Sequence, residues 1–416
     1  MLDVSELQEI LPELLLLCAI VAIAAQYLRI PYTTALAVAG VGVGSLYGFH
    51  PPLSRDLILL AFLPPLLFEG SLNIELLQLG RHWKHIALLA VPGTLVAAGT
   101  VALGLHLVVG MAWSHAMLAG VIVASTDPVS VLATMKEHGI SGGLRAILEG
   151  ESIFNDVVGI LLFSLALTWA FPGAHERHDI FETAAELVAE VGVGVGVGVG
   201  VGLLLHRLMT TVNDHLIETT LSIVCCYGSY VLAHSLHGSG VIAVVVSALL
   251  IGNYGVHVSM SKESRARLTE FWEVIAFLVN SAVFVLIGLA FEFSSLRDWK
   301  LLGAVAVVAF ALLAGRLLII AGILWPSALR LDRGTFPRRW LPAVYWGGLR
   351  GSIPIALVLG LAPAERTVAG INLVTLVFSV VLLSLIGQGL TFGPLLNRLG
   401  LGAGSFATAD PGSATE

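Results

Sequence analysis

The sequence predicts an all-α polytopic membrane protein with about 13 transmembrane helices. Composition is the first reason: of 416 residues, 57% are hydrophobic and only 12% are charged. An ordinary soluble domain carries about 25% charged and 45–50% apolar residues. The second reason is distribution, because the apolar residues fall into runs near the roughly 20 residues with which a helix crosses a bilayer. We therefore expect an integral membrane protein, with the lipid bilayer as a partner.

Thirteen apolar runs are candidate spans, and the second and ninth are the shortest. They lie at about 7–28, 32–48, 56–77, 85–109, 113–136, 144–171, 181–206, 216–236, 239–257, 268–291, 300–325, 340–362 and 370–395. The hydrophilic stretch from Ser259 to Glu270 is expected to link the ninth and tenth of them.

The seventh run contains a strict alternation of valine and glycine from Val191 to Gly202. A period of two is typical of a strand, but a lone strand in lipid would leave its backbone groups without partners. We therefore expect a helix. Its glycines would form two stripes suited to close helix packing, and these are Gly192, Gly196 and Gly200, and Gly194, Gly198 and Gly202.

Charge sets the expected orientation and excludes one class of partner. The net charge of −7 argues against a nucleic-acid-binding protein. An odd number of spans puts the termini on opposite sides. Fourteen of the 21 Lys and Arg residues then fall on the C-terminal side and five on the other, with Arg316 and Arg350 inside spans. The positive-inside rule predicts a cytoplasmic C-terminus and an external N-terminus.

Several charged residues lie inside the predicted spans. A charge at the bilayer centre costs at least about 2.5–3.5 kcal/mol, so it usually faces a cavity or a partner. The residues concerned are Glu69, Asp127, Glu149, Glu151, Asp156, Arg316 and Arg350.

The sixth span, with the sequence LEGESIFNDVVGILLF, carries a polar face. At 100° per residue, Ser152, Asn155 and Asp156 fall within one arc, and Glu149 lies a turn further back. Carboxylate, hydroxyl and amide oxygens are hard ligands, suited to an alkali cation or a proton. The alternative is a polar seam that only holds helices together, but a seam does not require an ionisable acid.

Two spans are predicted to break near the middle of the membrane. Ser125-Thr126-Asp127-Pro128 interrupts the fifth, and Gly347-Gly348-Leu349-Arg350-Gly351-Ser352-Ile353-Pro354 interrupts the twelfth, because proline removes a donor and disfavours helical geometry before it. The breaks lie seven spans apart, which reverses direction. We therefore predict two inverted six-helix repeats, at 1–172 and 213–398, with a linker helix at 173–212 and a disordered cytoplasmic tail at 399–416. The alternative is two ordinary proline kinks.

The breaks also suggest positions for charges. Arg350 is expected either to neutralise half-helix C-termini or to pair with Glu149 or Glu151. Asp127 would offset half-helix N-termini, whose partial positive charge favours an acid. Glu69 follows Pro64-Pro65 and is expected to face the same cavity, although a glutamate near a helix end is the simpler interpretation.

These motifs together resemble the monovalent cation:proton antiporter family, in its sodium–proton exchanger branch. The resemblance is carried by FLPPLLFEGSLN, STDPV, EGESIFNDVVGILLF and WGGLRGSIPIALVLGL in their relative positions. It implies the sodium–proton antiporter fold and a site in which the Asp156 carboxylate binds either a cation or a proton. Ser152 and the backbone around Thr126 would complete the alkali-cation site, with Glu69 nearby.

The resemblance further implies supporting roles and stoichiometry. Glu151, Asn155 and Arg350 would hold the crossed helices together; we add Glu149 to this supporting set and Asp127 to the ion- and proton-binding set. Asparagine rather than aspartate before Asp156 resembles the electroneutral exchangers. A homodimer in a prokaryotic plasma membrane, serving pH homeostasis and needing no cofactor, is also implied.

Elementary electrostatics gives the expected mechanism. Burial favours the protonated carboxylic acid, whereas a bound cation or a nearby arginine favours the carboxylate. A buried aspartate balanced between them can hold Na⁺, Li⁺ or K⁺ or a proton, but not two at once. Two other classes stay open: a passive cation channel, and an intramembrane enzyme, which the missing HExxH spacing disfavours.

Overall fold

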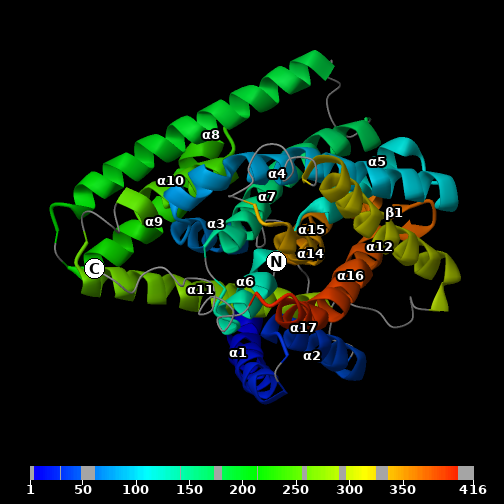
Figure 1. The fold of residues 1–416 in the computed structure, drawn as a ribbon, viewed down its shortest axis with the longest axis horizontal. Helices are drawn as coiled ribbons and strands as arrows, with labels where there is room; N and C mark the ends of the chain where they lie inside the picture. Colours follow the sequence, from blue (N-terminus) through cyan, green and yellow to red (C-terminus); the bar gives the residue numbers. More distant parts are fainter. Residues whose placement is uncertain are drawn as a thin grey trace, which may run out of the picture.

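The computed structural model describes residues 4–28, 30–47, 61–140, 142–172, 180–212, 214–254, 260–289, 297–324 and 336–401. Almost all of these residues are helical (Figure 1). The first eleven helices, with one π-helical turn, are α1 (Val4–Leu28), α2 (Tyr32–Tyr47), α3 (Leu63–Leu72), α4 (Leu76–Gly104), η2 (Leu105–Val109), α5 (Trp113–Ala124), α6 (Pro128–Glu137), α7 (Gly143–Ala170), α8 (Ile180–Met209), α9 (His215–Ser235), α10 (Gly240–Leu250) and α11 (Lys262–Leu289).

The remaining elements include a short hairpin and several helices interrupted by loops or tighter and wider turns. They are α12 (Trp299–Ile319), η5 (Ile320–Leu324), η6 (Arg338–Trp340), α14 (Leu341–Trp346), α15 (Ser352–Leu359), η7 (Pro363–Glu365), β1 (Thr367–Val368), β2 (Ile371–Asn372), α16 (Leu373–Ser384), η8 (Leu385–Gly389) and α17 (Leu390–Arg398). Thr367 pairs with Asn372 in the antiparallel hairpin.

The helices follow the predicted spans closely. Seven of the described helical stretches are long and apolar enough to cross a membrane, and the total of thirteen spans stays a prediction. Three details differ from expectation. The fourth span, predicted from about residue 85, begins at Leu76, because α3 ends at Leu72 and α4 already includes the charged residues before 85. Residues from Lys262 onward belong to α11 rather than to a linker, because the charged first turns continue the same helix. The hairpin adds two short strands to a fold expected to be all-α. The predicted tail falls outside the described residues beyond Leu401.

The valine–glycine repeat is helical, as predicted, within α8. One glycine stripe faces α10: a Cβ on Gly198 would lie 2.7 Å from the Ala243 carbonyl oxygen. The other stripe, which includes Gly196, has nothing within 4 Å of such a Cβ. Among the described residues, only the stripe with Gly194, Gly198 and Gly202 serves packing, which is what small residues allow between membrane helices.

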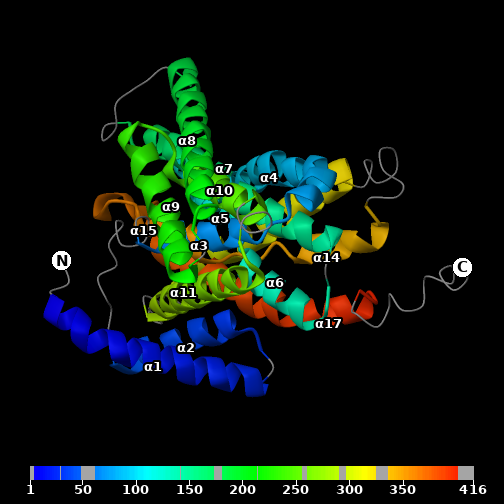
Figure 2. The ribbon, with the colours of Figure 1, turned by 90° about the vertical axis from the view of Figure 1, so that its left-hand side faces the viewer.

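The helices pack as two bundles. The crossing bundle consists of α4–α7, α12 and α14–α17, in which α4 packs against α5, α7 and α12. The flanking bundle consists of α1–α3 and α8–α11, in which α2 packs against α11, and α10 packs against α3, α8 and α9. In Figure 1, α8–α11 lie to the left and α12 and α16 to the right. Figure 2 shows α1 and α2 side by side along one edge.

Candidate functional site

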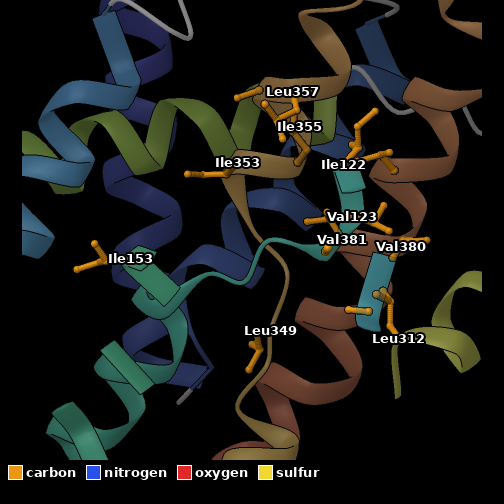
Figure 3. Close-up of a cluster of buried hydrophobic side chains, with 14 of the residues drawn as sticks. Ile122, Val123, Ile153, Leu312, Leu349, Ile353, Ile355, Leu357, Val380 and Val381 are labelled. Atoms are coloured by element: carbon orange, nitrogen blue, oxygen red, sulfur yellow. The ribbon is translucent and has the colours of Figure 1, made fainter. Parts of the chain in front are cut away.

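The site is built where two interrupted helices of the crossing bundle meet. The α5 helix ends at Ala124, and Ser125 is already extended, with ψ of 140°; the chain becomes helical again at Pro128. The second interruption separates α14 from α15. The two unwound segments cross (Figure 3), and the Asp127 amide donates to the Leu349 carbonyl oxygen at 2.8 Å. The predicted breaks are thus both present, and they are joined to each other.

Each interruption exposes helix ends that carry partial charges. Arg350 donates from Nη1 to the carbonyl oxygen of Ala124, the last residue of α5. The Asp127 side chain lies against Gly351, which directly precedes α15, so closely that a Cβ on this glycine would clash with its carboxyl group. Asp127 also directly precedes α6. The positive Arg350 therefore lies at a half-helix C-terminus, and the negative Asp127 lies at two half-helix N-termini. Each side chain compensates the partial charge of the helix end beside it.

One face of α7 packs against the first unwound segment. Ser152 Oγ donates to the Thr126 carbonyl oxygen at 3.0 Å and lies 2.9 Å from Thr126 Oγ1. Asn155 Nδ2 donates to Thr126 Oγ1 at 3.1 Å and to Ala124 O at 3.3 Å, and its Oδ1 accepts from Thr94 at 2.6 Å. These bonds fix the positions of three oxygen-bearing groups beside the next residue, Asp156.

Asp156 is the acid that this network leaves uncommitted. Its side chain is buried, with 4% of the residue exposed. Within the described part of the chain, its Oδ1 has no hydrogen-bond partner. A buried polar atom without a partner calls for a water, an ion or a functional explanation. Asp156 also lines a cavity, so a bound proton or cation could reach it.

The cavity has a volume of ≈ 660 Å³ and lies between the two bundles. Thr126, Asp127, Glu149 and Asp156 line it from the crossing bundle, and Glu69 lines it from α3. Glu69 is held by Asn73, whose Nδ2 donates to its Oε1 at 2.8 Å. Glu69 therefore faces the same cavity as Asp127 and Asp156, as expected from the sequence.

One end of the cavity is marked by exposed charges. Lys136 of α6 and Glu273 of α11 form an ion pair at 3.8 Å, with 74% and 54% of their side chains exposed. Arg145, 37% exposed, pairs with Glu149 at 3.6 Å. Asp156 lies eleven residues beyond Arg145, about 16 Å along α7. The cavity thus leads from a charged, exposed end to a buried carboxyl group.

Glu149 and Glu151 do not pair with Arg350, which was one of the two roles expected for this arginine. Glu149 binds Arg145, and Glu151 binds Arg316 through both guanidinium ends, with Nη2 at 2.8 Å from Oε2. Arg350 instead binds the end of α5. Its expected pairing with Glu149 or Glu151 is therefore replaced, because a nearer arginine takes each acid, and the alternative role at a half-helix C-terminus is the one observed.

Arg316 is a supporting residue whose partner could not be predicted from the sequence. Its Nε and Nη2 donate to the Val344 carbonyl oxygen in the last turn of α14, at 3.2 and 2.8 Å. Arg316 therefore does for α14 what Arg350 does for α5, and it also ties α12 to α7 through Glu151. Its charge within an apolar span was the only signal, since the partners lie 165 and 28 positions away.

The polar groups beside Asp156 are oxygen ligands of the kind that small hard cations take. Among the described residues, no cluster of three or more His, Cys, Asp or Glu side chains could hold a metal ion. The groups around Asp156 are hydroxyls, amides and backbone carbonyls, which suit alkali cations.

Comparison with known proteins identifies the family of this chain. The family model described as the transmembrane sodium/hydrogen exchanger matches residues 14–398. The chain belongs to the sodium/hydrogen exchanger family. This exchanger is 37% identical over 378 residues to the low-affinity Na⁺/H⁺ antiporter NhaS1 of Synechocystis sp., covering 90% of this chain and 70% of that protein. It is 35% identical over 373 residues to the Na⁺/H⁺ antiporter ApNhaP of Aphanothece halophytica, with the same two shares.

The fold comparison agrees with the family. The sodium proton antiporter MjNhaP1 of Methanocaldococcus jannaschii, solved at pH 8, superposes with a TM-score of 0.75 at 20% identity, covering 94% of this chain and 98% of that one. The fold class and the membership expected from the sequence are thereby confirmed. The exchanger is an integral membrane transport protein and not an enzyme.

Proposed function

We propose that this exchanger carries Na⁺ and protons in opposite directions by binding them alternately at Asp156. The observation that carries the proposal is that Asp156 lines the cavity while its buried Oδ1 has no hydrogen-bond partner among the described residues. Ser152 and the backbone at Thr126 supply further oxygens to the cation, and Asp127 and Glu69 keep the surroundings negative. Li⁺ and K⁺ take the same ligand type and are tested alongside Na⁺.

Competition follows from the chemistry of one carboxyl group. A protonated Asp156 has lost the charge that attracts Na⁺, and a bound Na⁺ keeps the group ionised. The empty carboxylate is a desolvated charge, which is costly to carry through an apolar barrier. Only the two neutralised forms then cross, so that transport in one direction requires the other ion to return.

Alternating access is supported by the division into two bundles around the cavity. Lys136 and Glu273 lie at the exposed end of the cavity and belong to different bundles. A movement of one bundle relative to the other would therefore close this entrance. The crossing of the two unwound segments would move together with Asp156. The residues that support it, Asn155, Glu151 and Arg350, and Glu149 on the cavity wall would move with it. The inverted repeats at 1–172 and 213–398, joined through 173–212, would supply the symmetry-related outward state.

Stoichiometry and orientation complete the proposal. Asn155 occupies the position beside Asp156 where a second carboxylate would add a charge, which favours one proton per cation and electroneutral exchange. The distribution of Lys and Arg favours a cytoplasmic C-terminus, with residues 399–416 as a tail. On this topology the cavity opens to the cytoplasm. A homodimer in a prokaryotic plasma membrane is proposed from the family alone.

The test is Asp156→Asn in proteoliposomes with a pH-sensitive dye. We expect Na⁺-driven proton movement to fall to the level of empty liposomes, while the purified variant stays folded. Wild-type exchange by this variant would refute the site. The wild-type rate should not respond to an imposed membrane potential if exchange is electroneutral.

The same preparation separates the exchanger from a passive cation channel. A channel would conduct Na⁺ without moving protons, and its flux would follow the membrane potential. Coupled alkalinisation or acidification on addition of Na⁺ would exclude that alternative.

A further inference from the structure

The cavity has a second wall, formed by α11 of the flanking bundle, which the proposed ion site does not use. Glu273, Ala276, Phe277 and Asn280 line the cavity, and their spacing places them on one face of the helix. Glu273 is exposed at the charged end. Asn280 lies seven residues deeper, about 10 Å along the helix axis, and only 3% of it is exposed.

Asn280 is unsatisfied at this depth. Its Oδ1 is buried and has no hydrogen-bond partner among the residues that the structure describes. A buried amide oxygen is normally bonded, so one that lines a cavity indicates a ligand or an ordered water. Asp156 lines the same cavity from the crossing bundle, and its buried Oδ1 also has no partner among the described residues. Each bundle thus contributes to one cavity a buried residue whose side-chain oxygen has no hydrogen-bond partner among the described residues.

The adjacent residue provides a contrast. Ser281 is also buried and its Oγ also lacks a partner among the described residues, but it does not line the cavity. The two side chains share a helix, a depth and an unmet hydrogen bond. They differ in whether a cation in the cavity could reach them.

We propose that the carboxamide oxygen of Asn280 binds the transported alkali cation, directly or through a water the cation retains, opposite Asp156. The inference rests on the proposed function of Asp156. A cation needs several oxygen ligands, whereas a proton occupies a single oxygen of Asp156. Asn280 therefore strengthens cation binding without strengthening proton binding, and it does so only while the two bundles lie as they do here.

The test compares Asn280→Ala with Ser281→Ala in proteoliposomes. We expect Asn280→Ala to raise the apparent KM for Na⁺ by about fivefold to tenfold, the effect of losing one polar contact, with kcat within about twofold of wild type. The ratio of variant to wild-type KM should stay constant between about pH 6.5 and 8.5, because proton affinity is unchanged. Ser281→Ala should leave KM unaltered.

A second variant and a binding measurement keep the test decisive. Asn280→Asp retains an oxygen at the same place, so its KM for Na⁺ should be at or below that of wild type even if the alanine variant does not fold. The stabilisation of the purified protein by Na⁺ against heat should fall in Asn280→Ala. An unchanged KM, an equal effect of Ser281→Ala, a raised KM in Asn280→Asp or a pH-dependent ratio would each overturn the inference.

Asp156→Asn, measured in parallel, reports on the proposed function separately. Stabilisation by Na⁺ that persists in Asp156→Asn would overturn the ion site itself. Loss of stabilisation in Asp156→Asn together with wild-type behaviour of Asn280→Ala would overturn only the role of Asn280.

Discussion

Replacing Arg316 by leucine removes the buried cation that joins α12, α7 and α14. Its side chain is 10% exposed and that of Glu151 is 2% exposed, so the variant leaves a buried carboxylate without its partner. Removing one member of a buried pair costs about 3–5 kcal/mol. The Val344 carbonyl oxygen also loses both of its donors from Arg316, which adds about 1–3 kcal/mol.

Replacing Arg316 and replacing Glu151 should therefore lower the stability of the protein by different amounts. Glu151→Leu breaks the ion pair but leaves Arg316 on the Val344 carbonyl oxygen, so it should destabilise the protein by less than Arg316→Leu. The double variant carries no unpaired buried charge, and it should be no less stable than Arg316→Leu alone. Denaturant titration in mixed micelles, read as a double-mutant cycle, measures the coupling.

An exposed pair of the same chemistry is the control. Arg267 and Glu263 lie one turn apart on α11, 54% and 76% exposed, with Nη2 and Oε1 at 3.2 Å. Such pairs contribute about 0.3–0.5 kcal/mol. Additive effects of Arg316→Leu and Glu151→Leu, or a loss for Arg316→Leu no larger than for Arg267→Leu, would refute the reasoning.

Two further predictions concern the glycine repeat and the cavity entrance. Gly198→Ala should lower the thermal stability of the purified protein, because its Cβ would meet Ala243 O at 2.7 Å. Gly196→Ala has open space around its Cβ and a better helix propensity, so it should not lower the stability. Equal melting temperatures of the two variants would contradict the packing of this stripe against α10. Lys136→Met removes the cation that pairs with Glu273 at the cavity's exposed end, so the apparent KM for Na⁺ should fall at low ionic strength. That difference should vanish above about 0.15 M salt, where screening is strong, and Lys300→Met, in an exposed position at the start of α12, should show no change.

Several features were predictable because they depend on neighbouring residues. Proline at 128 and the glycine-rich stretch before Pro354 break helices locally, and both breaks are present. Membrane spans follow from apolar length alone, and the lipid's lack of hydrogen-bonding groups forces even the valine–glycine repeat into a helix. The helical period places Ser152, Asn155 and Asp156 on one face, which is the face that meets Thr126.

Other features depend on which helices become neighbours, and a single sequence carries no local signal for that. The charge on Arg316 was visible, but its bond to Glu151 joins positions 165 apart and depends on α12 lying beside the crossing. Asn280 is an ordinary polar residue in an apolar span until α11 lines the cavity that Asp156 also lines. Sequence alone therefore determined the helices, their breaks and the acid at the site, because backbone sterics and hydrophobic length act within about 20 residues. Packing among the helices of the crossing bundle decided the partners of Arg316, Arg350 and Glu149. Packing between the two bundles decided which residues line the cavity from α11, because ion pairs and cavities are set by distance in space.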